Sequence, residues 1–197
     1  MNQPHRHYFN NLAPQWQDLM PEDQTLIDYL IRFEVQPGDV VLDAGAGTGR
    51  MTSHILELVG NQGFVIAQDI AEEMLLHGKR NTHLKAASWI CDDVTNMAFK
   101  DDVFDKIICF SMFPHIQKPE KALDECLRIL KSGGNLLILH ISDSDTLNAF
   151  HATLNEPVKN DRLIPASHLA LLMKEKGFQI KHCEEASNLY WLHACKP

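Results

Sequence analysis

The chain has 197 residues, of which 45% are hydrophobic and 22% charged, and this composition excludes a disordered chain, a collagen-like chain and a coiled coil. Its 18 basic and 26 acidic residues give a formal net charge of −8, without any cluster of Lys and Arg, so nucleic acid and acidic membrane surfaces are poor candidate partners. No apolar run approaches the ~20 residues of a membrane helix, and the polar N-terminus lacks the apolar stretch of a signal peptide. We therefore expect a cytoplasmic protein, monomeric or homodimeric, whose five widely spaced cysteines stay reduced.

Strands and helices are predicted to alternate along the first half of the chain. The predicted elements are helices over 8–19 and 22–33, a strand over 39–43, a helix over 48–59, a strand over 63–67, a helix over 70–80 and a strand over 87–91. Met51, Ile55 and Val59 share one face of the helix over 48–59, and Gly60 follows where a helix-ending glycine is common.

The second half continues the alternation and ends in a hairpin. The predicted elements are a strand over 105–110, a helix from Pro119 to the Lys-Ser-Gly-Gly run at 131–134, a strand over 135–141, helices over 144–154 and 166–176, and hairpin strands over 178–185 and 189–195. A long loop separates the two last helices. Such alternation predicts a mainly parallel α/β sheet with helices on both faces, whose ligands bind at the carboxyl ends of the strands.

A glycine-rich turn follows the first strand, with the sequence Asp-Ala-Gly-Ala-Gly-Thr-Gly-Arg over 43–50. The helix N-terminus behind it favours a negative group on the ligand. The dinucleotide fingerprint G-x-G-x-x-G would need Gly or Ala where Arg50 stands. Asp43 would repel a pyrophosphate but attract an ammonium, so the turn favours a ligand with both an amino group and a carboxylate.

Acidic residues follow the next two strands as well. Asp69 comes after the second strand, where an acid suits a ribose diol. Asp92 and Asp93 come after the third strand, where a carboxylate can accept a hydrogen bond from an adenine amino group. Each acid alone would also suit a helix N-cap or a solvated loop. Three strand ends with acids beside a glycine-rich turn together favour a nucleoside-containing ligand.

Four segments carry a resemblance to a known family: Val-Leu-Asp-Ala-Gly-Ala-Gly-Thr-Gly-Arg over 41–50, Asp-Ile-Ala-Glu-Glu-Met-Leu over 69–75, Phe104-Asp105, and 123–134 with its Gly-Gly pair. Over residues 37–141 the chain resembles the class I S-adenosylmethionine-dependent methyltransferases, of the small-molecule kind related to ubiquinone/menaquinone-biosynthesis enzymes. Ser132 stands where this family usually has Pro, at a turn position.

The resemblance implies a Rossmann-like, seven-stranded, mostly parallel sheet with the last strand antiparallel. It implies one methyltransferase domain over 1–197, made of a helical cap (1–34), a cofactor-binding core (35–141), and acceptor-side helices with the terminal hairpin (142–197). Within the cap, the aromatic segment 8–16 resembles the family's cover over the cofactor, although it would equally pack its aromatic side chains on the body of the protein.

The resemblance also implies S-adenosylmethionine as the cofactor. The methionyl end would be held near Asp43, the ribose hydroxyls by Asp69 and the adenine by Asp93, with the sulfonium near the backbone of Ser111. The implied cofactor-binding residues are Asp43, Ala44, Gly45, Gly47, Asp69, Ile70, Met74, Asp93, Val94 and Ser111.

Three histidines are candidates for the methyl-acceptor side: His115 after the fourth strand, His140 at the end of the fifth, and His151 on the following helix. They would act as a general base, as a metal or metalloid site, or as ordinary structural residues, and no metal ligand is assigned. The other histidines considered, His5 among them, fall in segments predicted to be surface or hairpin.

Methyl transfer by direct displacement to a small-molecule acceptor is the predicted function. The segment 110–116 lacks the [Asp/Asn]-Pro-Pro-[Tyr/Phe] motif of enzymes that methylate exocyclic or amide nitrogens, which favours a small metabolite. Two alternatives stay open. One is a protein that binds S-adenosylmethionine without catalysis, and the other is an NAD(P)-dependent oxidoreductase, against which Asp43 and Arg50 argue.

Overall fold

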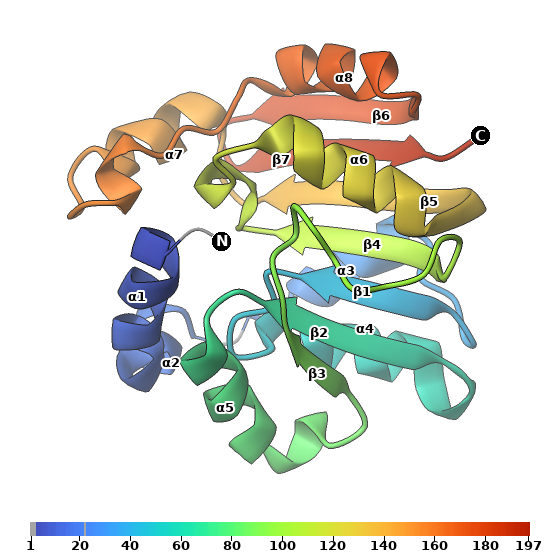
Figure 1. The fold of residues 1–197 in the computed structure, drawn as a ribbon, viewed down its shortest axis with the longest axis horizontal. Helices are drawn as coiled ribbons and strands as arrows, with labels where there is room; N and C mark the ends of the chain where they lie inside the picture. Colours follow the sequence, from blue (N-terminus) through green and yellow to red (C-terminus); the bar gives the residue numbers. More distant parts are fainter. Residues whose placement is uncertain (1–2, 22) are drawn as a thin grey trace.

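A computed structural model describes residues 3–21 and 23–197. Seven strands form one sheet in the order β3-β2-β1-β4-β5-β7-β6 (Figure 1). The strands are β1 (Val40–Ala44), β2 (Phe64–Asp69), β3 (Ser88–Cys91), β4 (Phe104–Phe110), β5 (Leu130–His140), β6 (Gln179–Ala186) and β7 (Leu189–Cys195). Neighbours from β3 to β5 are parallel, and β7 is antiparallel to both β5 and β6. The predicted fold, including the antiparallel last strand, is confirmed.

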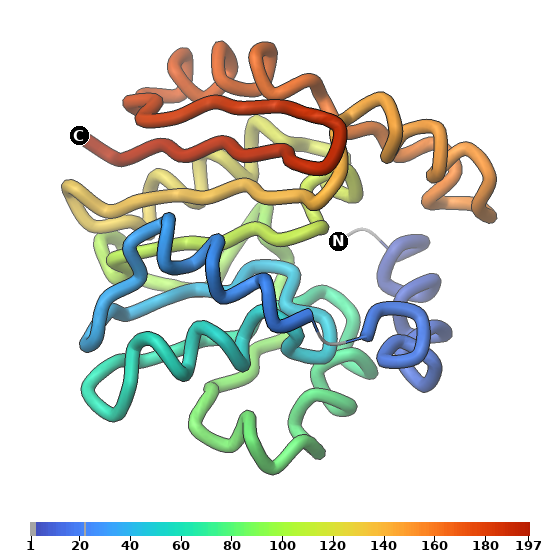
Figure 2. Tube along the Cα trace, turned by 180° about the vertical axis from the view of Figure 1, so that it is seen from behind, coloured from blue at the N-terminus to red at the C-terminus, as the bar shows by residue number. Residues whose placement is uncertain are grey.

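Helices cover both faces of this sheet. On one face lie α3 (Leu26–Arg32) and α4 (Arg50–Val59), which are in front in Figure 2, and on the other lie α6 (Pro119–Ile129) and α8 (Ala166–Glu175). The helix α5 (Glu72–Arg80) packs along β2 and β3. Because the central strands are buried on both faces, they read as continuous apolar runs in the sequence.

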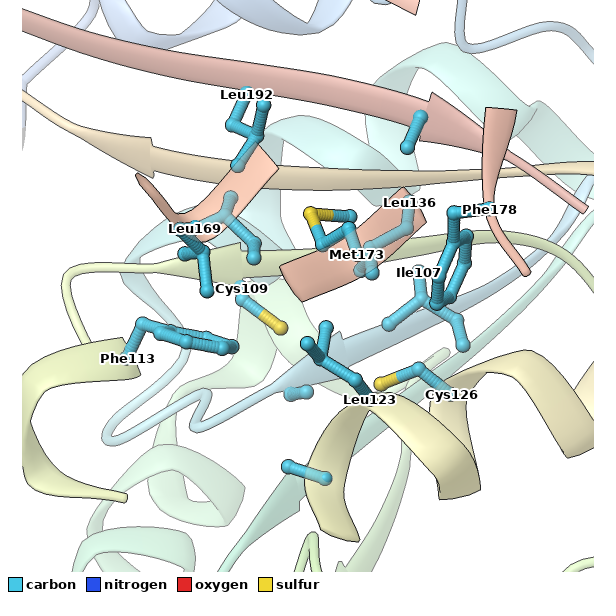
Figure 3. Close-up of a cluster of buried hydrophobic side chains, with 14 of the residues drawn as sticks. Ile107, Cys109, Phe113, Leu123, Cys126, Leu136, Leu169, Met173, Phe178 and Leu192 are labelled. Atoms are coloured by element: carbon cyan, nitrogen blue, oxygen red, sulfur yellow. The ribbon is translucent and has the colours of Figure 1, made fainter. Parts of the chain in front are cut away.

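The larger core lies between the sheet and the helices α6 and α8 (Figure 3). Leu123 and Cys126 of α6 pack there with Met173 of α8 against Ile107 and its neighbours on β4. These side chains are almost completely buried, and each apolar residue of that size contributes about 1.5–3 kcal/mol on burial. This packing fixes the strands whose carboxyl ends carry the predicted site residues.

Two helical segments stand beyond the end of the sheet where the parallel strands terminate, α1 (Gln3–Leu12) and α7 (Ser144–His151) (Figure 1). The short α2 (Trp16–Leu19) follows α1 after a single 3-10 turn. The 3-10 helices are η1 (Ala13–Gln15), η2 (Gly60–Gln62), η3 (Thr82–Leu84), η4 (Phe113–His115) and η5 (Val158–Asn160). Among the described residues, none of these helices has the length and apolar character to cross a bilayer.

Several predicted boundaries differ from the structure; for example, the helix predicted over 144–154 ends at His151. The first helix begins at Gln3 rather than near residue 8, and a 3-10 turn holding Pro14 interrupts it because proline cannot donate the backbone hydrogen bond of an α-helix. The second begins at Leu26 rather than 22. The helix α6 ends at Ile129 and passes directly into β5, so the run 131–134 belongs to an irregular part of that strand, where Gly133 has φ of +79°.

Candidate cofactor and acceptor site

A cavity of about 240 Å³ opens at the carboxyl ends of β1, β2, β3 and β4, under the helix α1. It is lined by His5, Phe9, Trp16, Gly45, Gly47, Gln68, Asp69, Ile70, Met74, Asp93, Val94, Thr95, Ser111, Met112, His115, Ile116, Gln117 and Lys118. Eight of the ten predicted cofactor residues are in this set, all except Asp43 and Ala44. The aromatic residues Phe9 and Trp16 of the predicted cap line it too.

The glycine-rich turn forms the floor of the cavity. The backbone N–H groups of Gly45 and Ala46 donate to the carbonyl of Gln68, at 2.8 and 2.9 Å, which ties the turn to the end of β2. Gly45 has φ of +73°, and a Cβ atom there would lie 2.6 Å from the Cβ atom of Met112. At Gly47 the nearest atom to such a Cβ is Nε1 of Trp16, at 3.5 Å, so this glycine leaves the backbone open to a ligand.

Asp43 lies behind this turn, only 1% exposed. Its Oδ2 atom accepts a hydrogen bond of 2.5 Å from the hydroxyl of Thr52. Burial raises the pKa of this carboxyl to about 7, against the opposing effect of the Thr52 hydrogen bond. Asp43 and Ala44 therefore lie one layer below the cavity surface, and an ammonium group brought close to Asp43 would favour its ionised form.

Asp69 ends β2 at the cavity wall. One carboxylate oxygen accepts from the N–H of Gly47 and the other from the N–H of Ala71, both at 2.8 Å. Burial raises the pKa of Asp69, while these backbone hydrogen bonds act to lower it. The carboxylate thus joins the turn to the start of α5, and Ile70 and Met74 line the cavity beside it.

The two acids after β3 have different surroundings. The carboxylate of Asp92 accepts from the N–H groups of Asp93 and Ala98, both at 2.8 Å, and this residue does not line the cavity. Asp93 does line it, with Oδ1 accepting from the N–H and hydroxyl of Thr95 at 3.0 and 2.7 Å. The choice of Asp93 over Asp92 as the candidate therefore agrees with the lining of the cavity.

Ser111 follows β4 with φ of +54°, a left-handed conformation that non-glycine residues rarely adopt. Its N–H donates to the carbonyl of Leu139 at 3.0 Å, so β5 holds the backbone in this conformation. Strained backbone of this kind concentrates at functional sites. The next residues form η4, which brings His115 to the same cavity.

On the β4 side of the cavity, separated from β3 and Asp93 by two strands in the order of the sheet, two imidazoles share one carboxylate. His115 Nδ1 donates to Asp161 Oδ2 at 2.6 Å, and His5 Nε2 lies 2.9 Å from both oxygens of the same group. His5 is 3% exposed and Asp161 8% exposed. Although burial acts to raise it, hydrogen bonds from His115 and His5 lower the pKa of Asp161 below its ordinary value.

The three candidate histidines lie near one another, but only His115 lines the cavity. The rings of His115 and His151 are 5.2 Å apart, and His151 Nδ1 lies 3.4 Å from the carbonyl oxygen of Asp161. His140 is 2% exposed and has no hydrogen-bond partner for Nε2 among the described residues. Burial, assisted by His115 and His151, lowers the pKa of His140 to about 3, so this imidazole is neutral.

The sequence reasoning missed His5 and Asp161. His5 was expected in a surface segment, and this expectation is wrong because the side chain is buried against a carboxylate 156 residues away. The only local signal was the spacing of four between His5 and Phe9, which puts both on one face of a helix. Asp161 lies in the long loop between α7 and α8, where no periodic pattern marks it.

The comparisons with known proteins agree with this geometry. Residues 42–138 match the model of a methyltransferase domain family. The chain is 33% identical over 170 residues to the ubiquinone/menaquinone biosynthesis C-methyltransferase UbiE of Vibrio campbellii, covering 73% of this chain and 66% of that protein. It is 38% identical over 112 residues to UbiE of Yersinia pestis, covering 55% of this chain and 45% of that protein. The match thus spans between about half and two thirds of these relatives.

A solved structure, a S-adenosylmethionine-dependent methyltransferase from Aquifex aeolicus, superposes with a TM-score of 0.73 at 21% identity, covering 96% of this chain and 97% of that one. The chain belongs to the class I S-adenosylmethionine-dependent methyltransferases. S-adenosylmethionine is the cofactor of this family. In this methyltransferase the cavity floor offers the open backbone at Gly47, and its walls offer carboxylates at the ends of β2 and β3, which fits that cofactor.

Proposed function

We propose that this methyltransferase transfers a methyl group by direct displacement from S-adenosylmethionine to a small-molecule acceptor. One observation carries the proposal: a single cavity is lined by Asp93, Asp69, the glycine-rich turn and His115, which lie at the ends of β3, β2, β1 and β4, and these strands are neighbours in that order. The family's cofactor would extend along the first part, and the acceptor would lie at the histidine end, under α1.

The residues at the first part of the cavity suit each portion of the cofactor. Asp69 would accept hydrogen bonds from the ribose hydroxyls, and Asp93 one from the adenine amino group. Ile70, Met74 and Val94 would pack on the adenine, since they line the same wall. The methionyl end would lie over the backbone of Gly45 and Gly47, with Asp43 beneath its ammonium group.

The bound cofactor supplies a methyl group already activated on a sulfonium, so the chain needs to position the acceptor and exclude water. Phe9 and Trp16 cover the cavity from the cap, with their rings 6.0 Å apart in an edge-to-face arrangement. The strained backbone at Ser111 would face the sulfonium. His115 would orient the acceptor, with His151 and His140 behind it rather than in contact with substrate.

Of the two alternatives, a protein that binds the cofactor without catalysis shares every one of these features. An oxidoreductase is disfavoured, because Asp43 lies under the turn and Arg50 begins α4 in place of the third small residue. At Gly49 a Cβ atom would meet Leu84 at 2.6 Å and Trp89 at 2.8 Å, so this glycine serves packing rather than a ligand.

Calorimetric titration tests the cofactor first. We expect S-adenosylmethionine and S-adenosylhomocysteine to bind with micromolar affinity and NADH not to bind. Binding of NADH alone would overturn every cofactor contact proposed here. Mass spectrometry of a small-metabolite mixture incubated with enzyme and cofactor then separates a catalyst from a binding protein, because only a catalyst converts S-adenosylmethionine to S-adenosylhomocysteine with a methylated product.

A further inference from the structure

Three potential metal ligands meet at the acceptor end of the cavity, on segments far apart in the sequence. His5 comes from α1, His115 from η4 and Asp161 from the loop after η5. One atom from each, His5 Nε2, His115 Nδ1 and a carboxylate oxygen of Asp161, lies within 4.8 Å of the other two. Two imidazoles and one carboxylate are the ligands with which proteins hold Zn²⁺ and related divalent transition metals at sites that keep a position open.

His5 and Asp161 are buried and His115 is partly buried, which distinguishes the triad from a solvated surface cluster. The buried carboxylate of Asp161 lies between two imidazoles. Its negative charge would be costly to bury without such partners. Its contacts to the two histidines are 2.9 and 2.6 Å. Bonds of ~2.0–2.1 Å to a tetrahedral ion would place the ligand atoms roughly 3.3 Å apart, so each of the two histidine–carboxylate contacts would lengthen by only about half an ångström.

We propose that His5, His115 and Asp161 bind one divalent transition-metal ion of the Zn²⁺ class at the acceptor end of the cavity. His5 and His115 both line the cavity whereas Asp161 does not, so the open coordination position would face the cavity. The ring of Phe9 lies 5.0 Å from that of His115, edge to face, and holds α1 over the site.

The role of this ion in catalysis rests on the proposed function. An acceptor with a thiol or an acidic hydroxyl would bind the ion through that atom, and its proton would pass to solvent because the metal lowers its pKa. The lone pair of the bound atom then forms the new bond to the methyl carbon. The carbon–sulfur bond of the cofactor breaks, and both of its electrons stay on sulfur, which leaves S-adenosylhomocysteine and a neutral thioether or ether that binds the metal weakly.

The experiment uses tag-free, full-length protein stripped with a chelator and titrated with Co²⁺, whose visible absorption reports its coordination, followed by displacement with Zn²⁺. The variants are His5→Gln and Asp161→Asn, and the matched control is His7→Gln, an exposed histidine on the same helix. We expect one Co²⁺ per chain in the wild type and the control, and an affinity lower by roughly 100-fold or more in both variants. Should Asp161→Asn fail to fold, His5→Gln decides the result alone.

Absence of stoichiometric Co²⁺ binding, or equal affinity in wild type and variants, would overturn the metal site and leave the triad as a hydrogen-bonded network. S-adenosylhomocysteine binding, measured on the same samples without metal, keeps the two proposals apart. Cofactor binding without metal binding removes only the metal site. Metal binding without cofactor binding supports the ion site and removes the proposed function together with the catalytic role of the ion.

Discussion

At the scale of single residues, the carboxyl group of Asp43 couples the stability of the protein to its cofactor site. The group is fully enclosed and its pKa is raised to about 7, mainly by burial. A carboxyl group with a raised pKa in the folded state stabilises the fold at low pH, and the contribution is lost as pH rises through the folded pKa. A buried carboxyl group at this position can therefore receive the ammonium group of the cofactor, but it lowers the folding stability of the cofactor-free protein near and above pH 7.

Replacing Asp43 by Asn should remove this pH dependence. Between its unfolded pKa near 4 and the folded value of about 7, the wild type should lose up to about 4 kcal/mol of stability that the variant keeps. Urea unfolding of both proteins without cofactor, from pH 4 to pH 8, measures the difference. Asn can still accept the hydrogen bond from Thr52. Any pH-independent difference in the free energy of unfolding between the two proteins cancels, because the test compares how their stabilities change with pH. Parallel curves would show that Asp43 does not titrate in this range.

Asp69 offers a second test at this scale. Its replacement by Ala should weaken S-adenosylhomocysteine binding by about 1–3 kcal/mol, since the ribose hydroxyls would lose their acceptor. Asp124→Ala is the control, because Asp124 is exposed on α6 and pairs with Lys176 at 2.8 Å on the surface. Calorimetry gives both affinities. An unchanged affinity in Asp69→Ala would remove this residue from the cofactor site.

At the scale of elements, the part of the cap made by α1, η1 and α2 joins the cofactor side of the cavity to the acceptor side. Arg6 forms a two-pronged ion pair with Glu72 of α5, at 2.7 and 2.9 Å, and the side chain of Asn10 accepts from the N–H of Glu73 at 3.0 Å. On the other side, His5 reaches Asp161. The cap thus places Trp16 over Gly47 and Phe9 beside His115.

Trp16 should therefore report cofactor binding. Of the three tryptophans, it alone lines the cavity within the described residues. We expect S-adenosylhomocysteine to change the intrinsic fluorescence of the wild type, and the change to disappear in Trp16→Phe while calorimetry shows an affinity within a few fold. If Trp16→Phe kept the full fluorescence change, the signal would come from elsewhere and the cap would not cover the cofactor.

Elements whose apolar pattern is local could be predicted from the sequence, and those fixed by distant contacts could not. Short apolar runs predict the strands β1, β2 and β4. The glycines of the run 43–50, together with Asp43, predict the turn at Gly45. The direct passage from α6 into β5 has no such signal, because its irregular pairing depends on contacts with β4 and with Lys196. The pairing of His5 with Asp161 equally depends on the folded cap, 156 residues from its partner.

At the scale of the whole molecule, cofactor binding should stabilise the chain as one unit, because the cavity is built from the ends of four strands together with the cap. At a ligand concentration 100 times the dissociation constant, mass action adds about 2.7 kcal/mol. For a chain of this length that corresponds to a rise in Tm of roughly 5–10 °C. Differential scanning calorimetry with S-adenosylhomocysteine measures it, and NADH at the same concentration is the control.

The cap distinguishes binding in this cavity from binding elsewhere. A ligand held between the strand ends and Trp16 would join α1 more firmly to the body, so the amides of residues 6–12 should exchange with deuterium more slowly when S-adenosylhomocysteine is bound. The hairpin of β6 and β7 lies at the far edge of the sheet, and its exchange should change only in step with global stability. A rise in Tm without slower exchange in α1 would mean that the ligand stabilises the sheet while the cap stays uncoupled from it. In that case the acceptor side would not be closed by cofactor binding, and the alignment of acceptor and methyl group would have to come from η4 and the loop that carries Asp161.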